Sequence, residues 1–304
     1  MRWLITSLSF AAERSVKQQR MIDVLVIGGD SMIGKALCQE LEINALTVAA
    51  TSRRKDLGSS DVFLDLAKPA KDWPILPKAK VWVIVAAIAR LAECRKSPEI
   101  SHLINVAAVK TLVELAAIQD ARVIFLSSDQ VYDGRQAHRS AKDKPCPHSV
   151  YGKQKANAEE RVLSLSEDNL VIRLTKVLSP SNALFTSWRD ALLRGETITP
   201  FTDKTFAPVS VQTVVTGICF AISKKVAGIL QFSGPDDITY ASAAQRYASL
   251  LGVTLNNVAP VSAATLGMPI EERPAFTSLD TKRATKTLGI EFPPLITLLE
   301  KMHV

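Results

Sequence analysis

Residues 21–34 read MIDVLVIGGDSMIG, and this stretch decides the fold. The apolar run Val24–Ile27 predicts a buried strand, and the apolar positions that recur from Ile33 onward at helical spacing predict a helix. The loop between them, Gly28–Gly34, is typical of a turn that presents the N–H groups of a helix N-terminus to a pyrophosphate. The middle glycine expected in such loops is Ser31 here, so we expect a slightly reshaped turn.

The alternation of apolar strands and amphipathic helices continues through the first two thirds of the chain. Further strands are expected at 47–51, 62–66, 81–87 and 122–128, and one long helix at 98–118. Strands that are apolar throughout pair in parallel and require helical crossovers, which cover both faces of the sheet. The fold class is therefore α/β, with a Rossmann-type doubly wound parallel sheet.

The rhythm of the chain changes after Arg173. Prolines become more frequent and strand candidates become short, as at Gly228–Ser233, while helices are expected at 211–222 and 240–251. This pattern predicts a smaller C-terminal lobe that closes over a substrate.

Three segments follow from these boundaries. We expect a dinucleotide-binding domain over residues 21–175 and a substrate-binding lobe over residues 176–304, interleaved with the Rossmann core. Residues 1–20 are expected to be a non-core extension rather than a signal peptide, because Met21 opens the first strand.

Composition argues against several classes of partner. Hydrophobic residues make up 47% of the 304, and the net charge of +7 is scattered, with Arg53–Lys55 as the one dense basic cluster. No long basic run is interleaved with aromatic residues, so no nucleic-acid partner is expected. The longest apolar run, Val81–Ala89, is far shorter than the ~20 residues that span a bilayer, so no membrane partner is expected. Four cysteines and four histidines without CxxC or HxxxH spacing predict no metal site and a reducing, cytoplasmic location.

The end of the second strand indicates which cofactor is bound. Residues Thr51–Arg54 offer no acidic side chain to a ribose 2′-hydroxyl, whereas two guanidinium groups can hold a 2′-phosphate. We therefore expect NADPH, with a solvated loop as the alternative. Asp65 either accepts a hydrogen bond from the adenine amino group or caps a helix that follows it. The cofactor-binding residues expected from these segments are Gly28, Asp30, Ser31, Met32, Ile33, Arg53, Arg54, Asp65 and Leu66.

Three residues have the chemistry of a proton-transfer site. Tyr151 and Lys155 are four residues apart, which places them on one face of a helix. A lysine ammonium beside a phenol is expected to lower the pKa of the phenol, so that Tyr151 can exchange a proton near neutral pH. Ser128 ends the fifth strand, where active sites of open α/β sheets lie. A surface tyrosine and lysine on an exposed helix is the alternative interpretation.

The glycine loop, LSSDQVYDG (Leu126–Gly134) and SVYGKQKANAE (Ser149–Glu159) resemble the extended short-chain dehydrogenase/reductases. The most similar branch is that of the dTDP-4-dehydrorhamnose reductases and their sugar-nucleotide-binding relatives, over roughly residues 22–294. The resemblance implies reduction of a keto group on a nucleotide-linked sugar by NADPH. It further implies the following roles: Ser128, Tyr151 and Lys155 catalytic, the last two also contacting the cofactor, Ala86 and Ala87 in the cofactor-facing fourth strand, and Asn105 as a structural or proton-relay residue.

A nucleotide sugar carries a pyrophosphate, which requires a cationic partner. The candidates are Lys176, Lys204 and Arg273, with Ser128 and Asp129 as further substrate contacts. Arg273 is preferred because a guanidinium can hold a phosphate with two hydrogen bonds. The alternative is that Arg273 pairs with a neighbouring glutamate at the surface.

Other functions stay open at this point. A sugar-nucleotide epimerase is one alternative, although Arg53 and Arg54 favour NADPH over the NAD that such epimerases use. A binding protein without turnover is another, similar to the regulatory subunit of methionine adenosyltransferase. Gln130 follows Asp129 where dehydratases have a glutamate, which disfavours a 4,6-dehydratase. The particular sugar and nucleotide are not determined, and a homodimer is left open.

Overall fold

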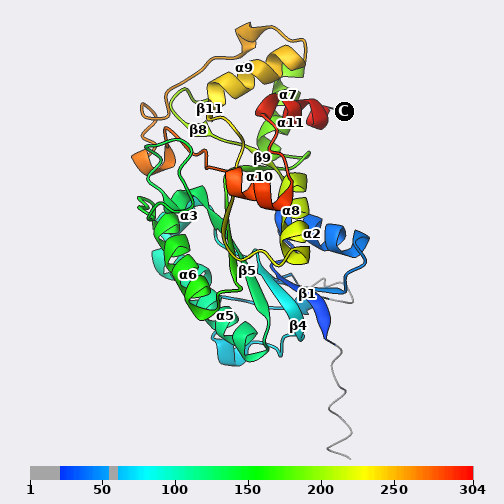
Figure 1. Cartoon of the computed structure of the whole chain (residues 1–304). Helices are drawn as coiled ribbons and strands as arrows, with labels where there is room; N and C mark the ends of the chain where they lie inside the picture. The colour runs from blue at the N-terminus through cyan, green and yellow to red at the C-terminus, as the bar shows by residue number, and fades with distance from the viewer. Residues whose placement is uncertain (1–20, 55–60, 304) are drawn as a thin grey trace, which may run out of the picture.

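The computed structural model describes residues 21–54 and 61–303. The predicted extension over residues 1–20 lies outside the described residues. The centre of the molecule is a seven-stranded parallel sheet of order β10-β6-β5-β4-β1-β2-β3 (Figure 1), which confirms the predicted fold class. Its strands are β1 (Ile22–Ile27), β2 (Val48–Ser52), β3 (Asp61–Phe63), β4 (Ala79–Ile84), β5 (Arg122–Ser128), β6 (Leu170–Leu174) and β10 (Gly228–Phe232).

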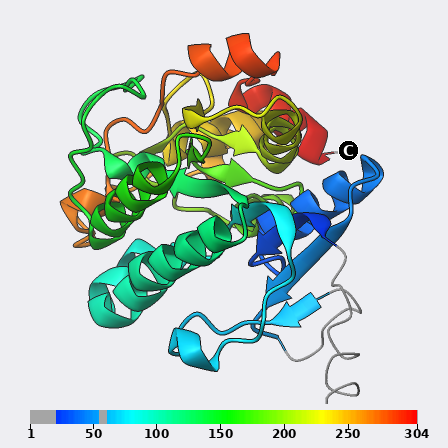
Figure 2. The ribbon, with the colours of Figure 1, turned by 60° about the horizontal axis from the view of Figure 1, so that its bottom comes forward.

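Helices cover both faces of this sheet because its strands are apolar on both sides. One face is covered by α2 (Met32–Ile43), α8 (Val211–Ser223) and α10 (Lys282–Leu288), and the other by α5 (Ala108–Ile118) and α6 (Val150–Leu165). Figure 2 shows α5 and α6 running along their face of the sheet. Alternate residues of one strand therefore enter two different cores, as Leu25 and Val26 of β1 do.

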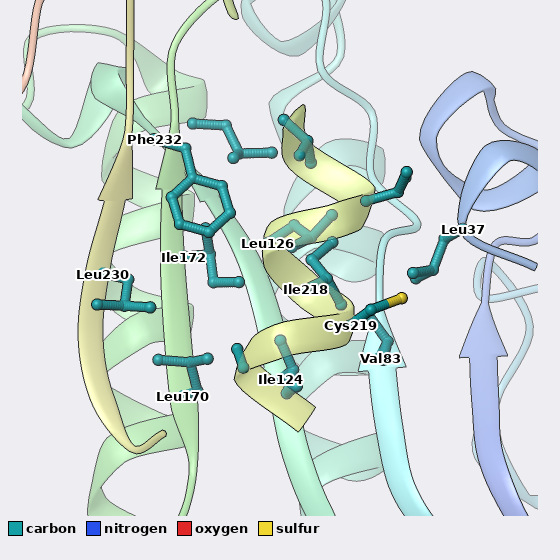
Figure 3. Close-up of a cluster of buried hydrophobic side chains, with 14 of the residues drawn as sticks. Leu37, Val83, Ile124, Leu126, Leu170, Ile172, Ile218, Cys219, Leu230 and Phe232 are labelled. Atoms are coloured by element: carbon teal, nitrogen blue, oxygen red, sulfur yellow. The ribbon is translucent and has the colours of Figure 1, made fainter. Parts of the chain in front are cut away.

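The core under α8 joins parts of the chain that lie far apart in the sequence. Ile218 of α8 lies near Leu126 of β5, whereas Cys219 points toward Leu37 of α2 and Val83 of β4 (Figure 3). Phe232 of β10 belongs to the same core, and all of these side chains are buried. The strand expected at Gly228–Ser233 thus pairs with β6 at the edge of the main sheet. Placing it within the smaller lobe was wrong, because its apolar residues complete the sheet's core. The domain boundary near residue 175 stays a prediction.

The smaller lobe has its own core, separate from the two that cover the sheet. It contains α7 (Ala183–Leu193), α9 (Tyr240–Leu250) and α11 (Leu295–His303), with the short pairs β7–β9 and β8–β11. Phe185 meets Trp188 and Tyr247 edge-on, with ring centroids 5.3 and 5.5 Å apart. The four short strands are β7 (Val177–Leu178), β8 (Thr205–Phe206), β9 (Val209–Ser210) and β11 (Ile238–Thr239).

The long helix expected at 98–118 is helical throughout but is not one α-helix. It consists of α4 (Pro98–His102), a π-helical turn (Leu103–Ala107) and α5. The wider π turn carries buried Asn105, and π turns inside α-helices are frequent at functional sites. By length and composition the stretch could cross a bilayer, with mean hydropathy 1.4, but one of its faces, with Ile104, Val109 and Leu112, is buried in the core that covers the sheet.

Candidate active site

A cleft of about 670 Å³ lies at the carboxyl ends of the central strands and extends to the smaller lobe. The cleft is lined by most of the predicted site residues, from both halves of the molecule. These residues are Gly28, Asp30, Ser31, Met32, Ile33, Arg53, Leu66, Ala86, Ala87, Ser128, Asp129, Tyr151, Lys155, Lys176 and Lys204. Arg54, Asp65, Asn105 and Arg273 are not among the lining residues.

The glycine loop forms a closed turn at the N-terminus of α2. Gly28 has a φ of +93°, and a Cβ there would lie 2.8 Å from the backbone nitrogen of Ala86. Ser31 caps α2 by accepting a hydrogen bond from Gly34 N at 3.0 Å, and its hydroxyl donates to Gly28 O at 2.8 Å. The serine therefore holds the loop in shape where the pattern has glycine. The N-terminus of α2 beside it can bind an anionic group.

The two arginines after β2 occupy different positions. Arg53 lines the cleft, whereas Arg54 pairs with Asp30, its Nε 3.7 Å from a carboxylate oxygen. Both side chains are exposed. This arrangement leaves Arg53 as the guanidinium that can meet a 2′-phosphate.

Asp65 caps a turn rather than the helix that was its alternative. Its carboxylate accepts a hydrogen bond from Ala67 N at 3.0 Å, and its carbonyl accepts one from Lys68 N. The side chain thus stabilises the turn after β3, and the neighbouring Leu66 lines the cleft.

Asn105 is a buried residue that stabilises the wall of the cleft. It is 1% exposed, and its amide exchanges hydrogen bonds of 2.9 Å with both the N–H and the carbonyl of Ile88. It also donates to Gln154 of α6 at 2.8 Å. Asn105 therefore joins the wall that follows β4 to the helix that carries Tyr151, rather than touching the cleft itself.

Helix α6 carries Tyr151 and Lys155 against the end of β5. Ser149 caps the helix by accepting from Gly152 N at 3.0 Å, and a Cβ on Gly152 would lie 1.9 Å from Gln130 O. Glycine is thus needed for the helix to approach the strand closely. Tyr151 and Lys155 are 8% and 2% exposed, and both line the cleft with Ser128. The alternative of an exposed tyrosine and lysine is therefore wrong.

Lys155 is held by the strand rather than by the phenol. Its Nζ donates to Leu126 O at 2.5 Å and lies 3.9 Å from the centroid of the Phe125 ring. Burial lowers the pKa of Lys155 to about 7, although nearby Glu159 acts in the opposite direction. The lysine can therefore gain or lose a proton near neutral pH.

The expected lowering of the Tyr151 pKa is absent. Burial raises the pKa of the phenol, and the negative charge of Asp129 raises it further, whereas Ser128 has a smaller opposing effect. Burial also raises the pKa of Asp129 to about 6, despite hydrogen bonds from Ser128 and Gln130. In this structure Tyr151 is a protonated phenol, which suits a proton donor.

A buried ion pair behind the site was missed at the sequence level. Arg173 of β6 and Glu159 of α6 are 1% and 3% exposed, and their closest N–O distance is 2.7 Å. Arg173 also donates to the hydroxyl of Tyr132, which donates to Ser140 O at 2.6 Å. The arginine inside the apolar run VIRLT was the available signal, because a buried guanidinium requires a partner.

The lobe side of the cleft carries two of the three candidate cations. Lys204 is half-buried, its Nζ 5.8 Å from the centroid of the Tyr240 ring, and Lys176 follows β6. Arg273 instead donates through Nε to Met268 O at 2.8 Å and lies 3.3 Å from Asp203. Its predicted role as the first phosphate ligand has no support from this placement. Glu271 and Glu272, the neighbouring glutamates that were its alternative partners, pair with Arg95 instead.

The model of the RmlD substrate binding domain family matches residues 22–303. The chain belongs to this family. It is 24% identical over 288 residues to the dTDP-4-dehydrorhamnose reductase of Aggregatibacter actinomycetemcomitans, covering 89% of this chain and 95% of that one. It is 30% identical over 152 residues to methionine adenosyltransferase 2 subunit beta of Xenopus laevis, covering 49% of this chain and 45% of that one. The predicted resemblance is thereby confirmed.

A solved structure has the same fold at low identity. The dTDP-4-dehydrorhamnose reductase of Bacillus anthracis, in complex with NADP, gives a TM-score of 0.80 at 18% identity. The match covers 93% of this chain and 99% of that one. At this identity the similarity establishes the architecture alone.

Proposed function

We propose that the protein is an NADPH-dependent reductase of a keto group on a nucleotide-linked sugar. The observation that carries this proposal is the convergence of Ser128, Tyr151 and Lys155 on one cleft, which also contains the glycine loop and Arg53. The relatives named dTDP-4-dehydrorhamnose reductase support the same reaction class.

The residues at one end of the cleft fit NADPH. The Gly28–Ile33 turn and the N-terminus of α2 would hold the pyrophosphate, and Arg53 would hold the 2′-phosphate. When bound, NADPH supplies the hydride that reduces the carbonyl carbon. Ala86, Ala87 and Leu66 would line this half of the cleft. Asn105 fixes the segment that carries Ala86 and Ala87 through its hydrogen bond with Ile88 N.

The residues of the chain handle the proton. As the carbonyl is reduced, the Tyr151 phenol donates its proton to the carbonyl oxygen, which becomes a hydroxyl. With substrate bound, the Ser128 hydroxyl would turn from Asp129 to donate its hydrogen bond to the same oxygen, and it would stabilise the developing negative charge there. The phenolate left behind regains a proton from Lys155, whose pKa of about 7 makes it a suitable donor. Lys155 is then recharged from solvent.

The other end of the cleft would hold the sugar nucleotide. Lys204 and Lys176 are the cations placed to meet the pyrophosphate, while Asp129 lies beside Ser128 and accepts its hydroxyl at 3.0 Å. Arg273 would contribute by fixing Asp203 and the loop at Met268. A reaction that consumes NADPH fits a cytoplasmic location, and a homodimer stays a prediction.

A second candidate is a dinucleotide-binding regulatory protein without turnover. The observation that favours it is the match to methionine adenosyltransferase 2 subunit beta over half of the chain. An epimerase remains a weaker alternative, because Arg53 favours NADPH over NAD. Turnover separates the candidates. A reductase consumes NADPH, an epimerase converts the sugar without net consumption of cofactor, and a binding protein catalyses neither reaction.

The test is NADPH oxidation, followed by absorbance, across a panel of nucleotide-linked 4-ketosugars. Tyr151→Phe should reduce kcat by about 10²–10⁴-fold and leave the Kd of NADPH nearly unchanged, because only the proton donor is lost. Tyr247→Phe is the matched control, since it removes a buried phenol hydroxyl in the core of the lobe. Wild-type turnover by Tyr151→Phe would exclude the proposed proton donor.

A further inference from the structure

The segment Met268–Phe276 forms part of the wall on the substrate side of the cleft, through Glu272 and Pro274. We call this segment the flap. Its base is fixed at both sides of the cleft. Thr205 Oγ1 donates to Pro274 O at 2.8 Å, and Phe276 N donates to Gly134 O at 3.0 Å. Before these anchors the flap contains one 3-10 turn, Ile270–Glu272, and Met268 N donates to Ala263 O at 3.0 Å.

Two glutamates of the flap pair with one arginine of the dinucleotide half, Arg95. Arg95 lies on α3 (Leu91–Lys96), directly after the cleft wall that follows β4. One of its guanidinium nitrogens lies 2.5 Å from a carboxylate oxygen of Glu272 and 3.4 Å from one of Glu271. The side chain of Glu272 is 14% exposed and that of Arg95 is 43% exposed, so the carboxylate is the shielded partner of the pair. Arg95 itself does not line the cleft.

Glu272 has a second cationic neighbour inside the cleft. Burial lowers the pKa of the Lys204 ammonium, and the negative charge of Glu272 is the largest effect that raises it. Glu272 and Lys204 line the same cleft, and no ion pair joins them among the described residues. A carboxylate released from Arg95 would be free to turn toward the Lys204 ammonium in that cleft.

We propose that Arg95 is a positioning residue that holds the Glu272 carboxylate against α3, so that Lys204 stays available to an anionic group of the substrate. The inference rests on the proposed function for the identity of the substrate, but not for the contact itself. It makes Arg95 a determinant of substrate affinity without contact between Arg95 and the substrate.

The decisive measurement compares three variants. Arg95→Met should raise the KM of the sugar substrate by about 2–5-fold, with kcat and the Kd of NADPH unchanged. Glu272→Gln should leave KM at or below the wild-type value, because the competing charge is gone. The double variant should behave like Glu272→Gln. If Glu272→Gln raises KM as much as Arg95→Met does, the pair only clamps the flap, and the proposal is wrong.

A binding experiment tests the contact without any sugar. Inorganic pyrophosphate is titrated by calorimetry into protein saturated with NADP⁺, so that the cofactor site is blocked. Arg95→Met should weaken binding about 2–5-fold, whereas Glu272→Gln and the control Arg194→Met should not. Arg194 is a suitable control because it forms an exposed pair with Glu196 in the lobe. Absence of pyrophosphate binding to the wild type would overturn the role of Lys204, and the inference with it, whether or not a ketosugar is reduced.

Discussion

The two ends of the cleft are built differently. At the dinucleotide end, the functional residues lie at strand ends and helix N-termini, where the backbone is fixed by the sheet: Ser128 ends β5, and Ser31 caps α2. At the lobe end, Lys204 and Arg273 lie in connections between short elements and are placed by side-chain contacts. A regular backbone makes side-chain positions deducible from sequence, whereas an irregular one leaves them to tertiary contacts.

The arginines at the dinucleotide end provide the sharpest test of this comparison. Arg53→Ala should raise the Kd of NADPH by about 10–150-fold, which corresponds to about 1.5–3 kcal/mol, and change that of NADH little. The reason is the loss of a charge-assisted contact with the 2′-phosphate. Arg54→Ala is the matched variant, and its effect should be smaller, because Arg54 pairs with Asp30 and does not itself line the cleft. Equal weakening of both cofactors by Arg53→Ala would show that Arg53 does not recognise the 2′-phosphate.

The sheet and much of the dinucleotide end could be predicted from the sequence, because the periodicity of apolar residues and the positions of polar residues at strand ends suffice there. Apolar runs predicted β5 to the residue and β1 and β4 to within three residues at each end. The YxxxK spacing placed Tyr151 and Lys155 on one helix face. The edge strand β10 was assigned to the lobe, since a short apolar run does not reveal its partner.

The rest depended on contacts that no local pattern contains. Asp65 was ambiguous because a helix N-terminus and an adenine both require an acceptor, and its carboxylate caps a turn instead. The pKa of Tyr151 was predicted in the wrong direction, since burial and Asp129 raise it, and the Lys155 ammonium donates to Leu126 O instead. Arg273 was preferred because a guanidinium can hold a phosphate, but its contacts with Asp203 and Met268 O hold it outside the cleft. Asp203 is far from Arg273 in the sequence, and a backbone carbonyl such as Met268 O has no sequence signal.

The lobe end is tested by replacing Lys204 and Arg273 in separate variants. Lys204→Met should raise the KM of the sugar nucleotide about tenfold, because a charged hydrogen-bonding contact is lost, and leave the Kd of NADPH unchanged. Arg273→Met should change KM less and lower the melting temperature more, because it frees Asp203 and Met268 O. The opposite ranking in substrate kinetics would return Arg273 to the role of phosphate ligand.

The smallest expected effect concerns Asp129, which lies where the two ends meet. Its pKa is raised by burial from an ordinary 3.8 to about 6, so the folded protein binds this proton more tightly than the unfolded chain does. Stability from this group is therefore lost as pH rises from about 4 to about 6, and ionised Asp129 destabilises the fold at neutral pH. Asp129→Asn should increase the free energy of unfolding by about 1–2 kcal/mol at pH 7, and this gain should vanish near pH 4. Denaturant unfolding at both pH values measures the difference. A gain that does not depend on pH would mean that the substitution acts through packing, and that Asp129 carries no buried charge between the two ends of the cleft.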